Sequence, residues 1–152
     1  GFGKVLQVVT ERGTTSTNIN NDWSATPANI GPTISITPSA TNSKIIVCWT
    51  GGVSLAAGSN ANKIGIVALE NTTNGTLFGT MRIGASLGGT TEDFFMNVSI
   101  IACDTTHNST SAQTYQLAAG RYSSTYNNNI YLGDGVPTTD EQQELVAIEI
   151  AG

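Results

Sequence analysis

The alternation of apolar and polar positions is clearest in residues 33–50, TISITPSATNSKIIVCWT, where two apolar runs flank a polar cluster. This cluster, residues 38–43, contains proline, serine and asparagine, which favour turns and interrupt strand pairing. The pattern predicts a β-hairpin or a corner between two sheets. In the second run Ile45, Val47 and Trp49 alternate with Ile46 and Cys48, so both faces of the strand are apolar. Such a strand needs cover on both sides, from packed layers or from one layer and a neighbouring subunit.

Short apolar runs with a two-residue period recur along the rest of the chain. They predict strands at residues 4–10, 53–57, 63–70, 76–83, 93–105, 112–119, 129–132 and 145–151. Gly51-Gly52 predicts a bulge or bend before the run at 53–57. Asn74-Gly75 predicts a tight hairpin, and the polar segment 105–111 predicts another between its flanking strands.

The run at 93–105 has the most regular alternation, and one of its faces is expected to point into the core. That face carries Phe94, Met96, Val98, Ile100 and Ala102. Residues 14–30 are polar and rich in turn formers, so we expect a surface loop or a weak edge strand there, anchored to the core by Trp23. With about eight or nine strands and no sustained 3.6-residue apolar period, the chain is predicted to be all-β. An antiparallel β-sandwich, in particular a jelly roll, is the architecture that this pattern favours.

Composition narrows the possible partners. The chain has 152 residues, which suits a single domain spanning residues 1–152. Only 11% of the residues are charged and the formal net charge is −5, which argues against nucleic acid as a partner. No run approaches the roughly 20 apolar residues of a membrane span, so membrane insertion is not expected. A chain that starts at Gly1 rather than Met is expected to be a processed product or part of a longer protein.

The sequence offers little for catalysis, and we expect no enzyme activity. His107 is the single histidine, and it follows Asp104 within a short polar segment. A catalytic triad needs rigidly held members beside an oxyanion site, which a polar loop does not provide. Glu92-Asp93 and Asp140-Glu141 are paired carboxylates, but adjacent strand residues point to opposite faces, so loop ends are the better interpretation.

Cofactor and metal sites are not expected either. With one histidine and no clustered cysteines, the chain has no ligand set for a transition metal. Asp22 or Asp134 could contribute to a calcium site, although an aspartate in a plain turn is the simpler interpretation. Cys48 and Cys103 lie in apolar runs; free buried thiols are favoured, and a disulfide across two packed sheets stays open.

The remaining candidate is a recognition surface in residues 121–135, RYSSTYNNNIYLGDG. A tyrosine ring offers a flat face with a polar tip, and it can stack on sugar rings with little entropic cost. Neighbouring amides can bond sugar hydroxyls. Alternatively, some of these tyrosines pack within strands or at a subunit contact, and both interpretations stay open. The candidate receptor-binding residues are Tyr122, Tyr126, Asn127, Asn128, Tyr131 and Asp134.

Four motifs together resemble a β-domain found at the C-terminal end of bacteriophage tail fibres, head fibres and appendages. They are GKVLQVV at residues 3–9, ISITPSATNSKIIVCW at 34–49, TYQLAAGR at 114–121 and LVAIEIAG at 145–152. In that family an I-x-P-S-x-x-S-K-I hairpin follows a GKVLQV-like strand, and an Ile-Glu-Ile strand ends the domain. The matching positions are Ile36, Pro38, Ser39, Ser43, Lys44, Ile45, Ile148, Glu149, Ile150 and Ala151. Residues 51–89 are individual to this chain.

The resemblance implies a virion component, assembled in the host cytoplasm and exposed on the particle. It implies a homotrimer with a jelly roll similar to that of tumour necrosis factor and the complement globular head, and contacts with other virion proteins and a host glycan or receptor. It transfers no defined binding residue. Two other classes stay open, a capsid decoration protein and an extracellular lectin-like module; location on tail or head and the identity of the host are not specified by the motifs.

Overall fold

The computed structural model describes residues 3–14, 18–24, 27–56, 62–86, 93–126, 128–132 and 142–152, with the backbone alone at residues 85 and 86. Strands account for most of these residues, as the sequence predicts. The elements are β1 (Val5–Gly13), β2 (Asn18–Ile19), β3 (Ala28–Ile36), β4 (Lys44–Ala56), β5 (Asn62–Asn71), β6 (Thr76–Ser86), β7 (Phe94–Asp104), β8 (Gln113–Arg121), a 3₁₀ turn η1 (Ser124–Tyr126), β9 (Asn129–Leu132) and β10 (Gln143–Ile150).

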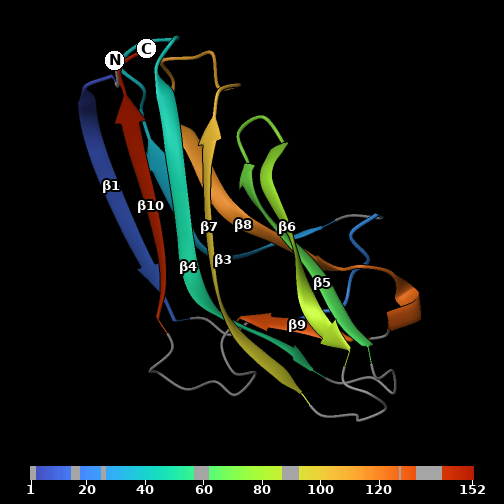
Figure 1. Cartoon of the computed structure of the whole chain (residues 1–152). Coiled ribbons are helices and arrows are strands. Elements are labelled where there is room, and N and C mark those ends of the chain that lie inside the picture. Colours follow the sequence, from blue (N-terminus) through green and yellow to red (C-terminus); the bar gives the residue numbers. More distant parts are fainter. Residues whose placement is uncertain are drawn as a thin grey trace.

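The strands form two antiparallel sheets that face each other in a sandwich (Figure 1). In the six-stranded sheet β1, β10 and β4 are neighbours, β7 pairs with the other side of β4, and β9 and β2 extend the far end. The four-stranded sheet has the order β3-β8-β5-β6. Four long antiparallel ladders are nested around the β5–β6 hairpin: β5 pairs with β6, β4 with β7, β3 with β8 and β1 with β10. This is the pairing of one long hairpin rolled into two sheets, so the predicted jelly roll is confirmed.

The turn after β3 and the turn after β7 each lead from one sheet to the other, which agrees with a predicted alternative in the first case and contradicts the prediction in the second. Residues 38–43 connect β3 in one sheet to β4 in the other, so they form the sheet-to-sheet corner and not a hairpin. Residues 105–112 likewise lead from β7 to β8 in the opposite sheet, and the hairpin predicted there is wrong. The hairpin between β5 and β6 is confirmed, with Gly75 at φ 72° in its turn. Local patterns mark a turn, but long-range pairing decides which sheet follows it.

The bulge that was one of the two alternatives at Gly51-Gly52 is absent, because β4 runs through both glycines with an unbroken ladder to β7. On its other side β4 pairs with β10 up to Thr50 and with β9 from Val53 onward. A Cβ atom at Gly51 would lie 2.8 Å from the indole of Trp49. The glycine therefore makes room for the buried tryptophan rather than for a bulge.

Residues 14–30, predicted as a surface loop or a weak edge strand, contain the short strand β2 at the end of the six-stranded sheet. β3 begins at Ala28, before the predicted start. A register shift between Ile30 and Ile34, with Gly31 at φ 76°, interrupts the alternation that would have revealed the strand.

The core lies between the sheets and is built from the inward side chains of both. Trp49 and Tyr115 are its largest fully buried aromatic residues. On β7 the predicted face is confirmed: Val98 and Ile100 are buried, whereas Phe95 and Ile101 on the opposite side are exposed. Period-two alternation thus identified the core side of this strand correctly.

A buried carboxylate closes one end of the sandwich. Glu149 on β10 is completely inaccessible, and its two oxygens accept four hydrogen bonds. The donors are Gln7 Nε2 at 2.7 Å, the Ser39 amide at 2.6 Å, the Ser39 hydroxyl at 2.9 Å and the Ser43 hydroxyl at 2.6 Å. Burial alone would raise the pKa of Glu149, but these hydrogen bonds outweigh it and lower the pKa to about 2. Glu149 therefore stays ionised inside the protein.

A second buried carboxylate links the two sheets at the same end. Asp104 on β7 accepts hydrogen bonds from Asn71 Nδ2 at 2.8 Å and the Tyr115 hydroxyl at 2.9 Å, both on the opposite sheet. The amide and hydroxyl of Thr106 also donate, each at 2.7 Å. Burial acts to raise the pKa of Asp104, but these bonds dominate and lower it. Because Glu149 and Asp104 both pair with Ile45, the two anions share one row of the six-stranded sheet.

Replacing Glu149 by glutamine should destabilise the domain strongly. The side-chain NH2 group of the new glutamine would face the hydrogen-bond donors of Gln7, Ser39 and Ser43. We therefore expect a loss of roughly 3 kcal/mol in the free energy of unfolding. Urea denaturation measures it. Glu144→Gln on the same strand is the control, because Glu144 forms only an exposed 3.7 Å ion pair with Arg12 and should change stability by less than about 0.5 kcal/mol. Equal losses in the two variants would contradict this role for Glu149.

Stability should also fall in acid over a defined range. The pKa of Glu149 is about 2 in the folded chain against 4.5 as the ordinary value, so the unfolded chain takes up the proton first. The stabilisation by this carboxylate is complete above about pH 4.5 and is lost as the pH falls towards 2. Thermal unfolding across this range should show a falling midpoint, with a smaller decrease in Glu149→Gln. The same slope in both proteins would rule out Glu149 as its source.

Candidate functional site

Two of the predicted tyrosines form an aromatic cluster with an arginine. The rings of Tyr122 and Tyr126 meet edge to face, with centroids 5.5 Å apart. The guanidinium carbon of Arg82, on β6, lies 3.9 Å from the centroid of the Tyr122 ring, which is a cation–π contact. Tyr122 is 39% exposed and Arg82 is exposed, so the cluster is open to solvent. We refer to Arg82, Tyr122 and Tyr126 as the Arg-Tyr cluster.

Backbone hydrogen bonds hold this cluster in place. The Tyr122 amide donates to the Ile64 carbonyl at 3.1 Å, which extends the ladder between β5 and β8 by one residue. The Tyr126 amide donates to the Ser123 carbonyl at 3.1 Å and closes η1. Immediately before Tyr122, Arg121 forms an ion pair with Asp22, and its backbone bonds Asn21 and Trp23. The backbone that carries both tyrosines is thus held in place before any ligand arrives.

The other predicted recognition residues do not join the cluster. Tyr131 alternates on β9 with the fully buried Ile130 and Leu132, so it points to the outer face of the six-stranded sheet. Asn128 is completely buried, and its side-chain oxygen accepts a hydrogen bond from the Ile64 amide at 3.4 Å. Asn127 and Asp134 lie outside the described residues. The stretch that looks continuous in sequence is therefore divided between two faces and the interior.

Arg82 was not identified from the sequence. It lies on β6, forty positions before Tyr122 (122 minus 82), and it reaches the tyrosine through the pairing of β5 with both β6 and β8. Asn74-Gly75 predicts the first of these pairings but carries no information on the second. A single arginine on a half-exposed strand gives no local signal of such a contact.

The outer face of the six-stranded sheet is apolar over two adjacent rows. One row contains Val8, Ile148, Ile46 and Cys103, and the next contains Thr10, Val146, Cys48 and Ile101. Val8 is 56% exposed and Ile101 is 71% exposed. We call these eight residues the apolar outer face. The cover expected on both sides of β4 is present on the inner side, where Ile45, Val47 and Trp49 are buried, whereas no described residue of the chain covers the outer side.

Both cysteines lie on the apolar outer face, and both are free thiols, as favoured, but Cys48 is half-buried and Cys103 is exposed, so their expected burial is wrong. Cys48 is opposite Ile101 and Cys103 is opposite Ile46, so the two cysteines are diagonal neighbours on one sheet. Diagonal positions have Cα atoms about 7–8 Å apart, beyond the usual span of a disulfide. A disulfide across two packed sheets is therefore the wrong interpretation. Burial raises the pKa of each thiol, so the thiolate is a minor species at neutral pH.

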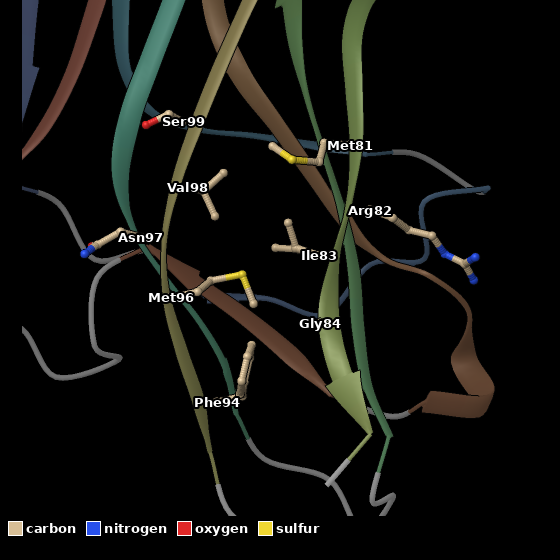
Figure 2. A pocket seen from close by; sticks show the side chains of 9 residues that line it. All are labelled: Met81, Arg82, Ile83, Gly84, Phe94, Met96, Asn97, Val98 and Ser99. Carbon is tan, nitrogen blue, oxygen red and sulfur yellow. The ribbon is translucent and has the colours of Figure 1, made fainter.

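A groove of about 380 Å³ opens at the sandwich edge between β6 and β7, which lie on opposite sheets (Figure 2). Met81 and Ile83 on β6 point across it towards Phe94, Met96 and Val98 on β7, whereas Arg82 points away to the outside. The strands approach closely beyond the groove, where a Cβ atom at Gly79 would lie 2.7 Å from the side chain of Ala102. The edge is therefore closed at one end and open, with an apolar lining, at the other.

The polar segment around His107 is occupied by structural contacts. Both oxygens of Asp104 accept hydrogen bonds from Asn71, Thr106 and Tyr115, and His107 is only 7% exposed. Neither nitrogen of His107 contacts Asp104 within hydrogen-bonding distance. Of the carboxylate pairs, Glu92, Asp140 and Glu141 lie outside the described residues.

Within the described ranges, no three His, Cys, Asp or Glu side chains gather closely enough to hold a metal ion. No helix in the same ranges is long and apolar enough to cross a bilayer.

Comparisons with known proteins give distant likenesses. No protein-family model and no curated protein matches the chain. Among solved structures, a subunit of the disulfide-linked pili of Bacillus endospore appendages is 10% identical with a TM-score of 0.37, over 98% of this chain and 93% of that one. The VP2 subviral particle of infectious bursal disease virus is 12% identical, with a TM-score of 0.33. The structure of the Gx strain of this virus is 16% identical, with a TM-score of 0.34. Both matches cover 95% of this chain and 38% of the viral chain. This chain thus spans well under half of the viral chains, and likenesses this weak carry no argument about its role.

Proposed function

We propose that this domain is a structural subunit of a bacteriophage fibre or appendage, which assembles as a homotrimer and contacts the host surface. In this role the protein works by assembly and binding, without catalysis, and is exposed on the virion. The observation that carries the proposal is the apolar outer face, which the described chain leaves uncovered. Only 11% of the residues in the chain are charged. A second copy of the chain would remove this surface from water.

A three-fold ring requires two different surfaces on each subunit, because only a two-fold contact can use the same patch on both copies. The apolar outer face supplies one surface. The groove between β6 and β7 supplies a second, and the two are continuous around β7. On that strand Ile101 belongs to the outer face, whereas Met96 and Val98 line the groove. This arrangement supports the packing of one subunit's edge against the next subunit's outer face.

The sequence resemblance to phage fibre domains supports the same proposal. Its opening, central and closing motifs, far apart in the chain, contribute Gln7, Ser39, Ser43 and Glu149, which meet in one buried hydrogen-bonded cluster. The matching positions therefore act together in this fold. Chance matches at separate surface positions would have no reason to converge.

The Arg-Tyr cluster is the proposed host contact. It lies near Ile64 on β5, whereas Asn71, at the other end of that strand, belongs to the Asp104 cluster. Seven residues of extended strand separate these ends by roughly 23 Å. A ligand bound at the tyrosines would therefore stay clear of the buried carboxylates.

Ile101→Glu should convert the trimer to a monomer. Ile101 is 71% exposed, so a charge there does not disturb the core of the single chain, but it would be buried without a partner in the assembly. Sedimentation equilibrium at micromolar concentration measures the change. As a second readout, Cys103 should react slowly with a maleimide in the wild type and quickly in the variant, because assembly covers it.

Leu77→Glu is the matched control, since Leu77 is an exposed apolar residue of β6 outside both surfaces and should leave the trimer intact. A wild-type protein that sediments as a monomer at micromolar concentration would overturn the proposed assembly. So would an Ile101→Glu protein that stays trimeric.

Tyr122→Ala should weaken binding of the fluorescently labelled domain to host cells by at least about tenfold, because the exposed ring is lost while the fold is unchanged. Leu77→Ala is the control with matched exposure, 38% against 39% for Tyr122. Circular dichroism verifies folding of both variants. Labelling is measured on candidate host cells and, in parallel, on phage particles that lack the domain.

Saturable labelling of cells that depends on Tyr122 supports a host contact. Labelling of the particles alone would contradict it and would favour a capsid decoration protein. Cell labelling that is unchanged in Tyr122→Ala would place the host contact elsewhere on the domain.

A further inference from the structure

We infer that the Arg-Tyr cluster binds an anionic sugar, with Arg82 holding the acidic group and the tyrosines contacting the sugar ring. This inference rests on the proposed host contact and adds the chemical class of the ligand. It depends on the juxtaposition of Arg82 with Tyr122 and Tyr126, which the sequence alone does not reveal.

Arg82 is an exposed cation that has no carboxylate partner within the described part of the chain. Ion pairs join Arg12 to Glu144 and Arg121 to Asp22. Arg121 is thus neutralised by Asp22, whereas the guanidinium of Arg82 lies against the ring of Tyr122. A guanidinium presents a planar fork of donors that matches the two oxygens of a carboxylate or two oxygens of a sulfate or phosphate.

Contact with the Tyr122 ring restricts the position of the Arg82 guanidinium. A side chain of this length normally loses rotamer entropy on binding, but contact with the Tyr122 ring has already restricted it. The Tyr126 ring meets Tyr122 edge to face, so the pair forms a ridge rather than one flat plate. The C–H groups of a sugar ring can pack against such a ridge while its acidic group reaches the arginine.

The net charge of −5 does not prevent binding of an anion at this position. Interactions between exposed charges are largely screened beyond about 8–10 Å at physiological ionic strength, so the nearest groups decide. Among the described residues near the ring, Asp22 is engaged with Arg121. Glu70 lies four positions from Ile66, the β5 partner of Arg82, which is roughly 13 Å along the strand. Neither Asp22 nor Glu70 therefore neutralises Arg82 directly.

The test is binding of the intact trimeric domain to immobilised polygalacturonate and to its methyl ester, which has the same sugar without the charge. We expect saturable binding to polygalacturonate and at least about tenfold weaker binding to the ester. Arg82→Gln should weaken polygalacturonate binding by a similar factor. Arg82→Lys should recover only part of it, because an ammonium group keeps the charge but loses the planar fork.

Arg12→Gln is the control, because it removes the same charge from an exposed arginine on β1 and should change the affinity less than about twofold. Dextran sulfate, compared with polygalacturonate, identifies whether sulfate or carboxylate is the preferred acidic group. Equal losses in Arg82→Gln and Arg12→Gln, equal binding to the ester, or equally tight binding to poly-L-glutamate would each overturn the inference.

Failure of the inference and failure of the proposed function are distinguishable. Host cells labelled through Tyr122, by a domain that binds neither anionic polysaccharide, would leave the host contact standing and remove the anionic sugar. Arg82-dependent binding to polygalacturonate without labelling of any host cell would support the anionic-sugar site and contradict the host contact.

Discussion

The buried carboxylate of Glu149 is the constraint on which the closed end of the sandwich depends. An ionised group without water is tolerated only when its oxygens are fully hydrogen-bonded, and here the donors come from β1 and from the corner between β3 and β4. The carboxylate therefore fixes the first strand, the corner and the last strand relative to one another. Because folded domains are stable by only about 5–15 kcal/mol, a cluster of this strength matters to the whole fold.

β7 connects the fold to the proposed assembly. Its inward residues complete the core at one end and line the groove at the other, while its outward residues extend the apolar outer face (Figures 1 and 2). Gly79 allows β6 to approach β7 on one side of the groove, so the opening is confined to the segment near Met96. One edge strand thus brings two different uncovered apolar surfaces next to each other. That is the geometry that a cyclic assembly of identical subunits requires.

The sequence predicted the strands better than their connections. Alternation in β7 reports burial directly, so its core side could be read from residues such as Val98, whereas the second apolar side of β4, with Ile46, is not covered by the described chain. Whether the chain after Asp104 returns along the same sheet or crosses to the other depends on long-range pairing, which no local pattern encodes. The register shift at Gly31 concealed the start of β3 for a similar reason.

For the candidate site, composition led to the tyrosines but not to their arrangement. Tyr122 and Tyr126 are close in sequence and in space, and their contact was within reach of prediction. Tyr131 points elsewhere because it alternates with the buried residues of β9, a strand too short for a clear pattern. Arg82 lies next to Tyr122 only because β5 pairs with both β6 and β8, which no local pattern predicts. Glu149 was identified as part of a motif, but its hydrogen-bond partners were not.

The distance between the buried carboxylates and the Arg-Tyr cluster has a consequence for how such a domain can evolve. Substitutions separated by more than about 7–10 Å, with no shared partners, usually act independently on stability. The cluster residues lie at the opposite end of β5 from Asn71 and Asp104. Replacements around Tyr122 can therefore accumulate with little penalty to folding, so a lineage could change what it adheres to while the scaffold stays the same.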